Sequence, residues 1–391
     1  MSGPGKMCLQ RESLPAAVSL LAGREIVEEE ALCLNVRGRL EHCDRCSLAC
    51  HAGALVLSPD ALEVNREKCT GCGACVPACP AGALRLNGFS PARFLEALEG
   101  GTEVHLHCTE SEDDGGGMVV PCFKVLDERL LAAAAAGGVE VVHLHGLDRC
   151  QTCHHGGAMR QVARMRLRLK RWLDGEAPQL RPATGAVATG DGVRRRQDQP
   201  PLSRRAFLRF TGAGAIQEAS RWLVPVVEED EVPVLPFFQG DPDEYRQAHP
   251  YQVQLAQRAD QVPWKEGVEL PWRLRSLAQH CTACLTCGRR CPTGALQAKE
   301  SGKSLGITFE LALCTDCGLC EALCPVAAVT THPVRLFQEV AAPRHLLMMR
   351  RQRDCEQCGV PFLPDEPGAI VCPTCSNESD LDEEWMAMLG G

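Results

Sequence analysis

Apolar and polar residues follow two different periods in the middle of the chain. Short apolar runs at residues 103–107, 118–120 and 139–144 have the length and β-branched content of strands. Between them, residues 90–100 and 126–136 have helical patterns, and the first begins with Ser90 as N-cap and Pro91 in the first turn. Strands that alternate with helices predict a small parallel α/β unit.

A further helical pattern at residues 159–173 is strongly basic. Arg160, Arg164, Arg168 and Arg171 recur at helical spacing. A solvated face is the simpler interpretation of this stripe. The alternative is that it docks to an acidic redox partner or to acidic segments of the protein itself.

Composition divides the chain further. Residues 174–202 are rich in Pro, Gly, Ala, Arg and Asp and predict a flexible linker. Residues 203–270 have a Pro-rich centre and predict a connecting segment that wraps around other units. The predicted divisions are an N-terminal segment (1–32), a first cysteine-rich module (33–88), a central α/β module (89–173), the linker (174–202), the connecting segment (203–270), a second cysteine-rich module (271–340) and a tail (345–391).

Length and charge narrow the class of protein. The chain has 391 residues, 45% of them hydrophobic, and a net charge of -9, which gives no reason to expect nucleic acid as a partner. No signal peptide and no run of about 18 apolar residues is evident, so we expect a cytoplasmic protein without a membrane span. Residues 203–209 resemble a twin-arginine export motif, but their internal position favours a helix start capped by Ser203.

Cysteine is the unusual feature, with 25 residues that fall almost entirely in tight clusters. Such spacing indicates metal ligation, because a disulfide scaffold would be smaller and secreted. Three segments have the run C-x2-C-x2-C-x3-C-P, in which one loop can surround three corners of a cubane while the fourth cysteine binds elsewhere. They are Cys69, Cys72, Cys75, Cys79 with Pro80; Cys281, Cys284, Cys287, Cys291 with Pro292; and Cys314, Cys317, Cys320, Cys324 with Pro325.

The last two runs, with a hairpin predicted from residues 294–296 to 307–309 between them, resemble the two-cluster bacterial ferredoxin family. The resemblance implies 4Fe–4S clusters and a crossed arrangement, in which the fourth cysteine of each run binds the other cluster. Carried onto this sequence, it implies one set of Cys281, Cys284, Cys287 and Cys324, and another of Cys314, Cys317, Cys320 and Cys291.

The first module resembles the same family but has an incomplete first run. Residues 40–55 nearly repeat residues 69–84, except that Leu40 stands where Cys69 stands. The crossed arrangement implies one complete set (Cys69, Cys72, Cys75, Cys50) and one that lacks a ligand (Cys43, Cys46, Cys79). We favour Cys33 as the missing ligand of a 4Fe–4S cluster; Cys8, His42, a 3Fe–4S cluster, or Cys33 as a plain buried residue are the alternatives. The apolar runs 54–57 and 83–86 of this module predict two strands that pair.

The central module has four further cysteines, Cys108, Cys122, Cys150 and Cys153. Their order among strands and helices resembles the delta subunit of methyl-viologen-reducing hydrogenase, which implies an iron–sulfur cluster; zinc or no metal are the alternatives. Six nearby histidines are either alternative ligands or surface residues. They are His105, His107, His143, His145, His154 and His155.

The tail has two C-x2-C knuckles, Cys355 with Cys358 and Cys372 with Cys375. Two such knuckles make a tetrahedral S4 site, so we expect structural zinc in a zinc-ribbon-like unit, with mononuclear iron as the alternative.

The expected architecture is therefore an α+β multi-domain chain with two ferredoxin-like modules, an α/β module between them and a zinc-ribbon-like tail. No nucleotide-binding or nucleophile motif is evident. We expect an electron-transfer subunit that relays single electrons between redox partners such as hydrogenase, dehydrogenase or heterodisulfide-reductase-like subunits. The alternatives are an iron–sulfur assembly or redox- and iron-sensing regulatory protein, and a reductase that acts at the central cluster.

Overall fold

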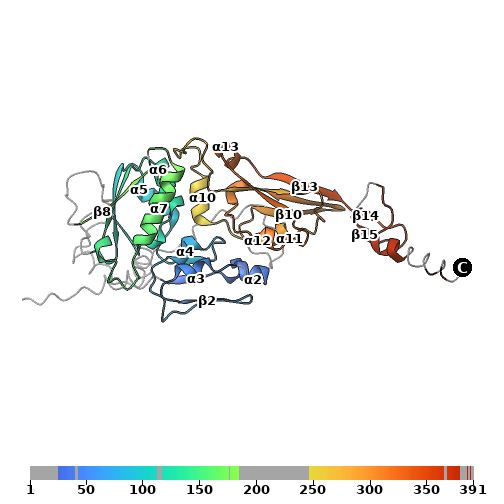
Figure 1. Ribbon diagram of the computed structural model, residues 1–391, viewed down its shortest axis with the longest axis horizontal. Helices are drawn as coiled ribbons and strands as arrows, with labels where there is room; N and C mark the ends of the chain where they lie inside the picture. Colours follow the sequence, from blue (N-terminus) through green and yellow to red (C-terminus); the bar gives the residue numbers. More distant parts are fainter. Residues whose placement is uncertain are drawn as a thin grey trace, which may run out of the picture.

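The structure is a computed structural model that describes residues 25–39, 43–111, 117–175, 177–184, 246–364 and 368–378, with 385 and 388. It mixes helices and strands along one elongated body. In Figure 1 the central module lies at one end, helix α10 in the middle, the second module beyond it and the tail at the far end, while the first module lies alongside. Residues 185–245, with the twin-arginine-like stretch 203–209, lie outside the described residues.

The first module consists of two small antiparallel sheets. Strand β1 (Ile26–Glu28) pairs with β4 (Leu84–Leu86), and β2 (Leu55–Leu57) pairs with β3 (Leu62–Val64). The prediction that the two runs after the cysteine clusters pair with each other is therefore wrong. Each pairs with another partner: the four-residue connection at 58–61 brings β3 beside β2, and the buried Ile26 places β1 beside β4.

The central module contains the predicted parallel sheet. Its order is β6 (Met118–Val120), β5 (Glu103–Cys108), β7 (Val141–His145) and β8 (Gln179–Ala183), and every pair is parallel. The α/β prediction is confirmed. The prediction of linker over residues 179–183 is wrong, because this segment extends the sheet and buries Leu180 against it.

Three helices cover the apolar face of this sheet. They are α5 (Pro91–Leu98), α6 (Glu128–Ala136) and α7 (Met159–Trp172). As predicted, the Ser90 hydroxyl caps α5 by accepting from the Arg93 amide at 3.4 Å. The basic stripe lies on α7, where Arg168 forms an ion pair with Glu128 of α6, and the other three arginines are exposed.

Helix α10 (Pro250–Ala256) connects the halves of the molecule. It packs on α5 and α6 of the central module and on η4 (Leu311–Leu313) of the second module. After it, the chain buries Val262 and Trp272 and forms an isolated bridge between Leu173 and Trp264.

The second module has the same plan as the first, with longer strands. Strand β9 (Arg273–Leu277) pairs with β12 (Val329–Pro333), and β10 (Leu296–Ser301) pairs with β11 (Ser304–Phe309). The predicted hairpin is thus confirmed. Strand β13 (His345–Arg351) adds to β11 and carries the chain toward the tail.

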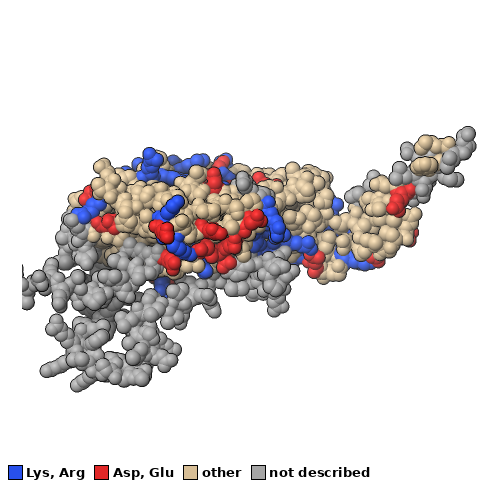
Figure 2. Space-filling model, turned by 90° about the horizontal axis from the view of Figure 1, so that it is seen from below, with Lys and Arg blue, Asp and Glu red and all other residues tan. Residues whose placement is uncertain are grey.

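The tail is a separate small unit that projects from one end of the body (Figures 1 and 2). Strands β14 (Arg353–Asp354) and β15 (Pro361–Phe362) pair beside a core of Phe362 and three buried cysteines. No helix in the described ranges is long and apolar enough to cross a membrane. The remaining short helices are η1 (Glu30–Leu32), α2 (Leu34–Gly38), α3 (Arg45–Ala49), α4 (Cys75–Ala78), η2 (Phe123–Val125), η3 (Leu147–Arg149), α11 (Thr286–Arg290), α12 (Leu319–Ala322) and α13 (Phe337–Val340).

Candidate iron–sulfur and metal centres

One turn geometry recurs after the last cysteine of each ferredoxin-type run, the incomplete first run included. The third residue after that cysteine has positive φ in all four cases: Gly53 (57°), Gly82 (71°), Gly294 (72°) and Ala327 (48°). The turn brings a following backbone amide to the sulfur, with N to Sγ distances of 3.4 Å for Cys50, 3.5 Å for Cys291 and 3.2 Å for Cys324. The repeated Ala-Gly-Ala-Leu of the first module therefore supplies an N–H donor to a thiolate.

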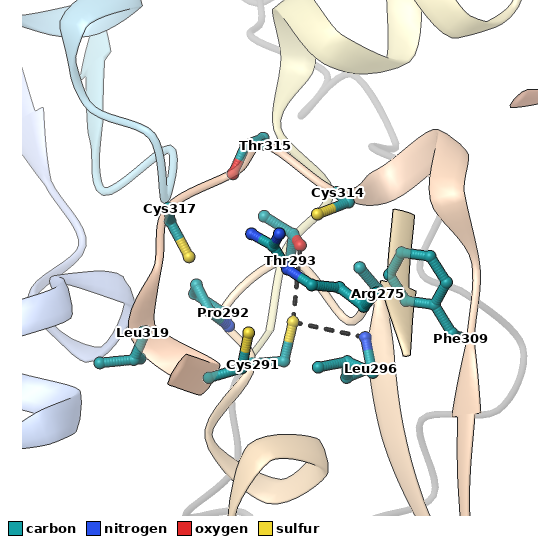
Figure 3. A pocket seen from close by; sticks show the side chains of 12 residues that line it. Arg275, Cys291, Pro292, Thr293, Leu296, Phe309, Cys314, Thr315, Cys317 and Leu319 are labelled. Carbon is teal, nitrogen blue, oxygen red and sulfur yellow. Dashed lines mark hydrogen bonds between the residues drawn. The ribbon is translucent and has the colours of Figure 1, made fainter. Parts of the chain in front are cut away.

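In the second module, the cysteines line two cavities. One cavity is lined by Cys291, Cys314, Cys317 and Cys320, and Figure 3 shows the first three directed toward one another. A second cavity is lined by Cys281, Cys284, Cys287 and Cys324. Each cavity thus receives three cysteines from one run and the fourth from the other run, as the crossed arrangement requires.

In the first module, one group of cysteines surrounds Cys75. Burial raises the pKa of Cys75 well above that of a free thiol, and thiolates at Cys72, Cys46, Cys69 and Cys50 add to the rise. Three of these neighbours are the cysteines expected to share a cluster with Cys75.

The incomplete set of the first module meets Cys33. Burial, together with the Cys79, Cys43 and Cys33 thiolates, raises the pKa of Cys46 to about 12. Burial likewise raises the pKa of Cys33, with a contribution from Cys43. The structure therefore brings Cys33 to the three cysteines that lack a fourth partner. Of the alternative ligands, Cys8 and His42 lie outside the described residues.

A local clamp holds Cys33 in this place. Cys33 precedes α2, and Asn35 in that helix exchanges two hydrogen bonds with the backbone of Cys43: its Nδ2 donates to the carbonyl at 3.0 Å, and its Oδ1 accepts from the amide at 2.8 Å. Asn35 is 3% exposed, so both bonds are shielded from water. Helix α2 and the cysteine cluster are thereby fixed to each other.

The four central cysteines converge at the carboxyl ends of β5 and β7. Burial raises the pKa of Cys108, and thiolates at Cys150 and Cys153 add to it. Burial also raises the pKa of Cys122 to about 12, and the Cys72 thiolate of the first module and Cys108 contribute. The central set therefore lies next to the complete set of the first module.

Glycine and backbone amides shape this site. A Cβ on Gly146, whose φ is 96°, would lie 2.7 Å from the Cys108 sulfur, so only glycine fits there. The amide of Ala158, at the start of α7, lies 3.4 Å from the Cys150 sulfur, and the His155 amide lies 3.4 Å from the Cys153 sulfur. These donors suit a negatively charged group on the sulfurs.

Four of the six nearby histidines form an array on the sheet. His105 and His143 stack at 4.5 Å, His107 and His145 at 4.2 Å, and the Nδ1 of His105 lies 2.9 Å from the Nε2 of His145. Side chains alternate along a strand, so His105 and His107 lie on the opposite face of β5 from Cys108. These four therefore engage one another on the far face of the sheet.

The remaining two histidines lie near Glu110. One ligand atom from each of Glu110, His154 and His155 lies within 4.8 Å of the others, and the Nδ1 of His154 is 3.8 Å from a Glu110 oxygen. His154 is exposed and His155 is buried.

In the tail, all four sulfurs of Cys355, Cys358, Cys372 and Cys375 lie within 4.8 Å of one another. Backbone N–H groups of Cys358 and Cys372 lower the pKa of Cys355 to about 6. Four close sulfurs, one of which readily forms a thiolate, are the donor set that a tetrahedral S4 metal site needs.

Helix α10 contacts a cysteine of each ferredoxin-like module. The Nε2 of His249 lies 2.9 Å from the Cys79 carbonyl oxygen, and the Nε2 of Gln252 donates to the Cys314 carbonyl at 3.3 Å. The Tyr251 hydroxyl donates to Val125 of the central module at 2.7 Å. Burial holds the pKa of His249 well below its usual value, so the ring is neutral and donates from Nε2. No local sequence pattern marked these residues, because the contacts are between segments distant in sequence.

The cavities fit anionic groups bound through sulfur. The Nε of Arg275 and the Oγ1 of Thr315 both line the cavity of Cys314, are buried, and have no hydrogen-bond partner among the described residues. Buried donors without partners are costly and indicate an absent acceptor. Soft thiolates in sets of four, with N–H donors aimed at them, match the needs of an iron–sulfur cluster.

Two parts of the chain match known families. Residues 62–85 match the 4Fe-4S binding domain, and residues 280–328 match the 4Fe-4S dicluster domain. The chain carries two ferredoxin-type 4Fe–4S domains. The ferredoxin-type protein NapF of Haemophilus influenzae is 30% identical over 77 residues, which are 19% of this chain and 43% of that protein. The chain thus spans less than half the length of this relative.

Proposed function

We propose that the protein relays single electrons through a chain of clusters and serves as an electron-transfer subunit or adaptor for redox enzymes. Four 4Fe–4S clusters would be held by the two crossed sets of each ferredoxin-like module, with Cys33 completing the set of Cys43, Cys46 and Cys79. A further iron–sulfur cluster would be held by Cys108, Cys122, Cys150 and Cys153. When bound, such clusters supply reversible one-electron chemistry.

The observation that carries the proposal is the continuity of the cysteine sets. The first-module Cys72 lies close enough to the central Cys122 for its thiolate to raise the pKa of Cys122. On the other side, His249, the N-cap residue of α10, is bonded to Cys79 of the first module, and Gln252 in α10 is bonded to Cys314 of the second module. A storage or structural role needs no such contact between sets.

The residues around the cysteine sets would serve electron transfer in three ways. Backbone amides donate to the sulfurs of Cys50, Cys291 and Cys324, which stabilises added negative charge. Buried apolar side chains such as Leu285 and Ile307 exclude water from the second module. Cys284 is the exposed member of its set and marks a point where a redox partner can approach.

The tail would hold one zinc ion in a zinc-ribbon-like unit, because its four sulfurs converge and its described core otherwise consists of Phe362, with Ala369 and Val371 packed against it. Its position at the end of the body suits a surface for partner binding (Figure 1). The partners we propose are redox proteins of the hydrogenase, dehydrogenase or heterodisulfide-reductase-like type, in the cytoplasm.

The test is metal analysis of anaerobically purified full-length protein, followed by low-temperature EPR of oxidised and reduced samples. We expect roughly 18 to 20 irons and about one zinc per chain, with signals from several clusters after reduction. Only a few irons with several zincs would contradict the relay. Clusters that are lost on oxidation, with loss changing partner binding and reduction not changing it, would favour the regulatory alternative.

A further inference from the structure

The two cavities of the second module differ in one charged residue. The cavity of Cys281, Cys284, Cys287 and Cys324 is lined by apolar and threonine side chains, with no charged side chain among its lining residues. The cavity of Cys291, Cys314, Cys317 and Cys320 is also lined by Arg275, whose side chain extends between the cysteines (Figure 3).

Arg275 is held firmly in this position. It lies on β9 and its side chain is 2% exposed. Its Nη1 donates to the Thr331 hydroxyl and its Nη2 to the Asp316 carboxylate, both at 2.6 Å. Its buried Nε has no partner among the described residues, which leaves one donor for a group in the cavity.

The guanidinium is a permanent positive charge. Burial alone would lower the pKa of Arg275, but the Cys314 and Cys320 thiolates and Asp316 raise it above its ordinary value. The influence is mutual, since Arg275 opposes the rise that burial causes in the pKa of Cys314 and of Cys320.

The counter-charges of Arg275 face water. The side chains of Asp316 and Glu321 are 47% and 44% exposed, so solvent screens them, whereas the guanidinium is shielded. Arg344, which is influenced by the Cys291 thiolate, does not line the cavity and pairs with Glu310 at 2.9 Å. The shielded guanidinium of Arg275 is therefore the charged group that lines this cavity, and the other cavity has none among its lining residues.

We propose that Arg275 makes the cluster held by Cys291, Cys314, Cys317 and Cys320 the higher-potential member of the pair in the second module. Each added electron increases the negative charge of a cluster, and a nearby buried cation stabilises the reduced form. If both cavities held clusters, one electron lost by the cluster in the uncharged cavity would be gained by the cluster beside Arg275, and Arg275 would stay protonated. Because Cys314 is also the cysteine bonded to α10, electrons gather on the side of the second module that faces the first. This inference rests on the proposed electron-transfer function.

The experiment is an EPR-monitored redox titration of the anaerobically purified full chain, with iron analysis of each variant. Arg275→Gln should lower one midpoint so that its reduced-to-oxidised ratio falls at least tenfold at a given potential, which is about 59 mV for one electron. Arg273→Gln is the matched control, since Arg273 lies on the same strand but outside both cavities and should leave every midpoint unchanged.

Asp316→Asn is the second variant, and it should act in the opposite direction. Asp316 has a φ of 53°, which asparagine tolerates, so the fold is retained. Loss of the exposed counter-charge should raise the same ratio about threefold. If Arg275→Gln does not retain its iron, the midpoint measured in Asp316→Asn tests the inference instead. Unchanged midpoints in an iron-loaded Arg275→Gln, or in Asp316→Asn, would overturn the inference, whereas wild-type protein without clusters would overturn the proposed function itself.

Discussion

The two ferredoxin-like modules share one plan but complete their cysteine sets differently. In the second module, eight cysteines from two full runs line two cavities, and nothing outside these runs is needed. In the first module, seven run cysteines have Cys33 as a neighbour, which comes from before the first run and precedes α2. In the proposed arrangement, Cys33 completes the second set of thiolates from a different chain segment, which another contact fixes in place.

The fixing contacts of the first module are polar and buried. Asn35 binds the backbone of Cys43, and Arg37 donates to the Ala31 carbonyl at 2.9 Å and to the Arg290 carbonyl of the second module at 3.0 Å. The second module needs no equivalent clamp, because its cysteines follow one another in continuous loops. The first module should therefore be the more sensitive of the two to substitutions outside its cysteine runs.

The most severe test of this comparison is Cys33→Ser. We expect this variant to lose about four irons per chain, because the remaining three thiolates would not hold a complete cluster. Iron and acid-labile sulfide measured after anaerobic purification would show the loss. Cys8→Ser is the control and should keep its full iron content. Unchanged iron in Cys33→Ser, or an equal loss in Cys8→Ser, would assign the fourth ligand elsewhere.

A second test addresses the contact between the first module and the start of α10. We expect His249→Phe to lower the free energy of unfolding by about 1–3 kcal/mol, because the buried Cys79 carbonyl would lose its donor. Thermal unfolding of the iron-loaded protein is the measurement. His280→Phe is the matched control, since His280 makes a similar bond to the Val326 carbonyl at 3.1 Å but is exposed. Equal losses in the two variants would show that α10 is not a buried joint.

A third test addresses the clamp on Cys33. We expect Asn35→Ala to lower the free energy of unfolding by about 1–2 kcal/mol and to speed iron release from the first module, because two shielded hydrogen bonds are lost. Iron release into a chelator, followed over time, gives the readout. Asn65→Ala, at an exposed asparagine of the same module, should release iron at the wild-type rate. A wild-type rate in Asn35→Ala would mean that α2 is held by its apolar contacts alone.

The smallest effect should come from the turn after Cys50. Gly53→Ala is expected to cost about 1 kcal/mol or less, because a Cβ there meets no atom within 4 Å and only the positive φ is unfavourable. The second module supports this view, since Ala327 occupies the equivalent turn at φ 48°. Chemical denaturation of the iron-loaded variant would measure the cost. Any loss of iron would show that the turns of the two modules are not equivalent.

The cysteine patterns were sufficient for much of the site. In the second module, the spacing of two runs predicted that the first three cysteines of each would meet, since seven residues of loop cannot spread three thiolates far apart. The ferredoxin resemblance implied the crossed fourth cysteine of each set. The alternation of strands and helices likewise predicted the parallel sheet of the central module. Local spacing carried this information because the contacts involved are short in sequence or follow a fixed period.

The pairing of strands in the first module could not be obtained in the same way. The three-residue runs of this module are equally apolar, and several partners satisfy them. Only the tertiary structure shows that Ile26–Glu28 is the partner of Leu84–Leu86. The strand at Gln179–Ala183 was missed for a related reason, because an edge strand with a single buried leucine has almost the composition of a linker.

The sequence by itself determined the kind of chemistry in this protein: sets of thiolates, their loops and their approximate number. Tertiary structure alone decided which charges and polar groups surround each set. Arg275 reaches Cys314 from a strand about forty residues away, and α10 joins Cys79 to Cys314 across more than two hundred residues. Ligand spacing is a local property of the backbone, whereas the electrostatic environment of a buried group depends on every segment packed around it.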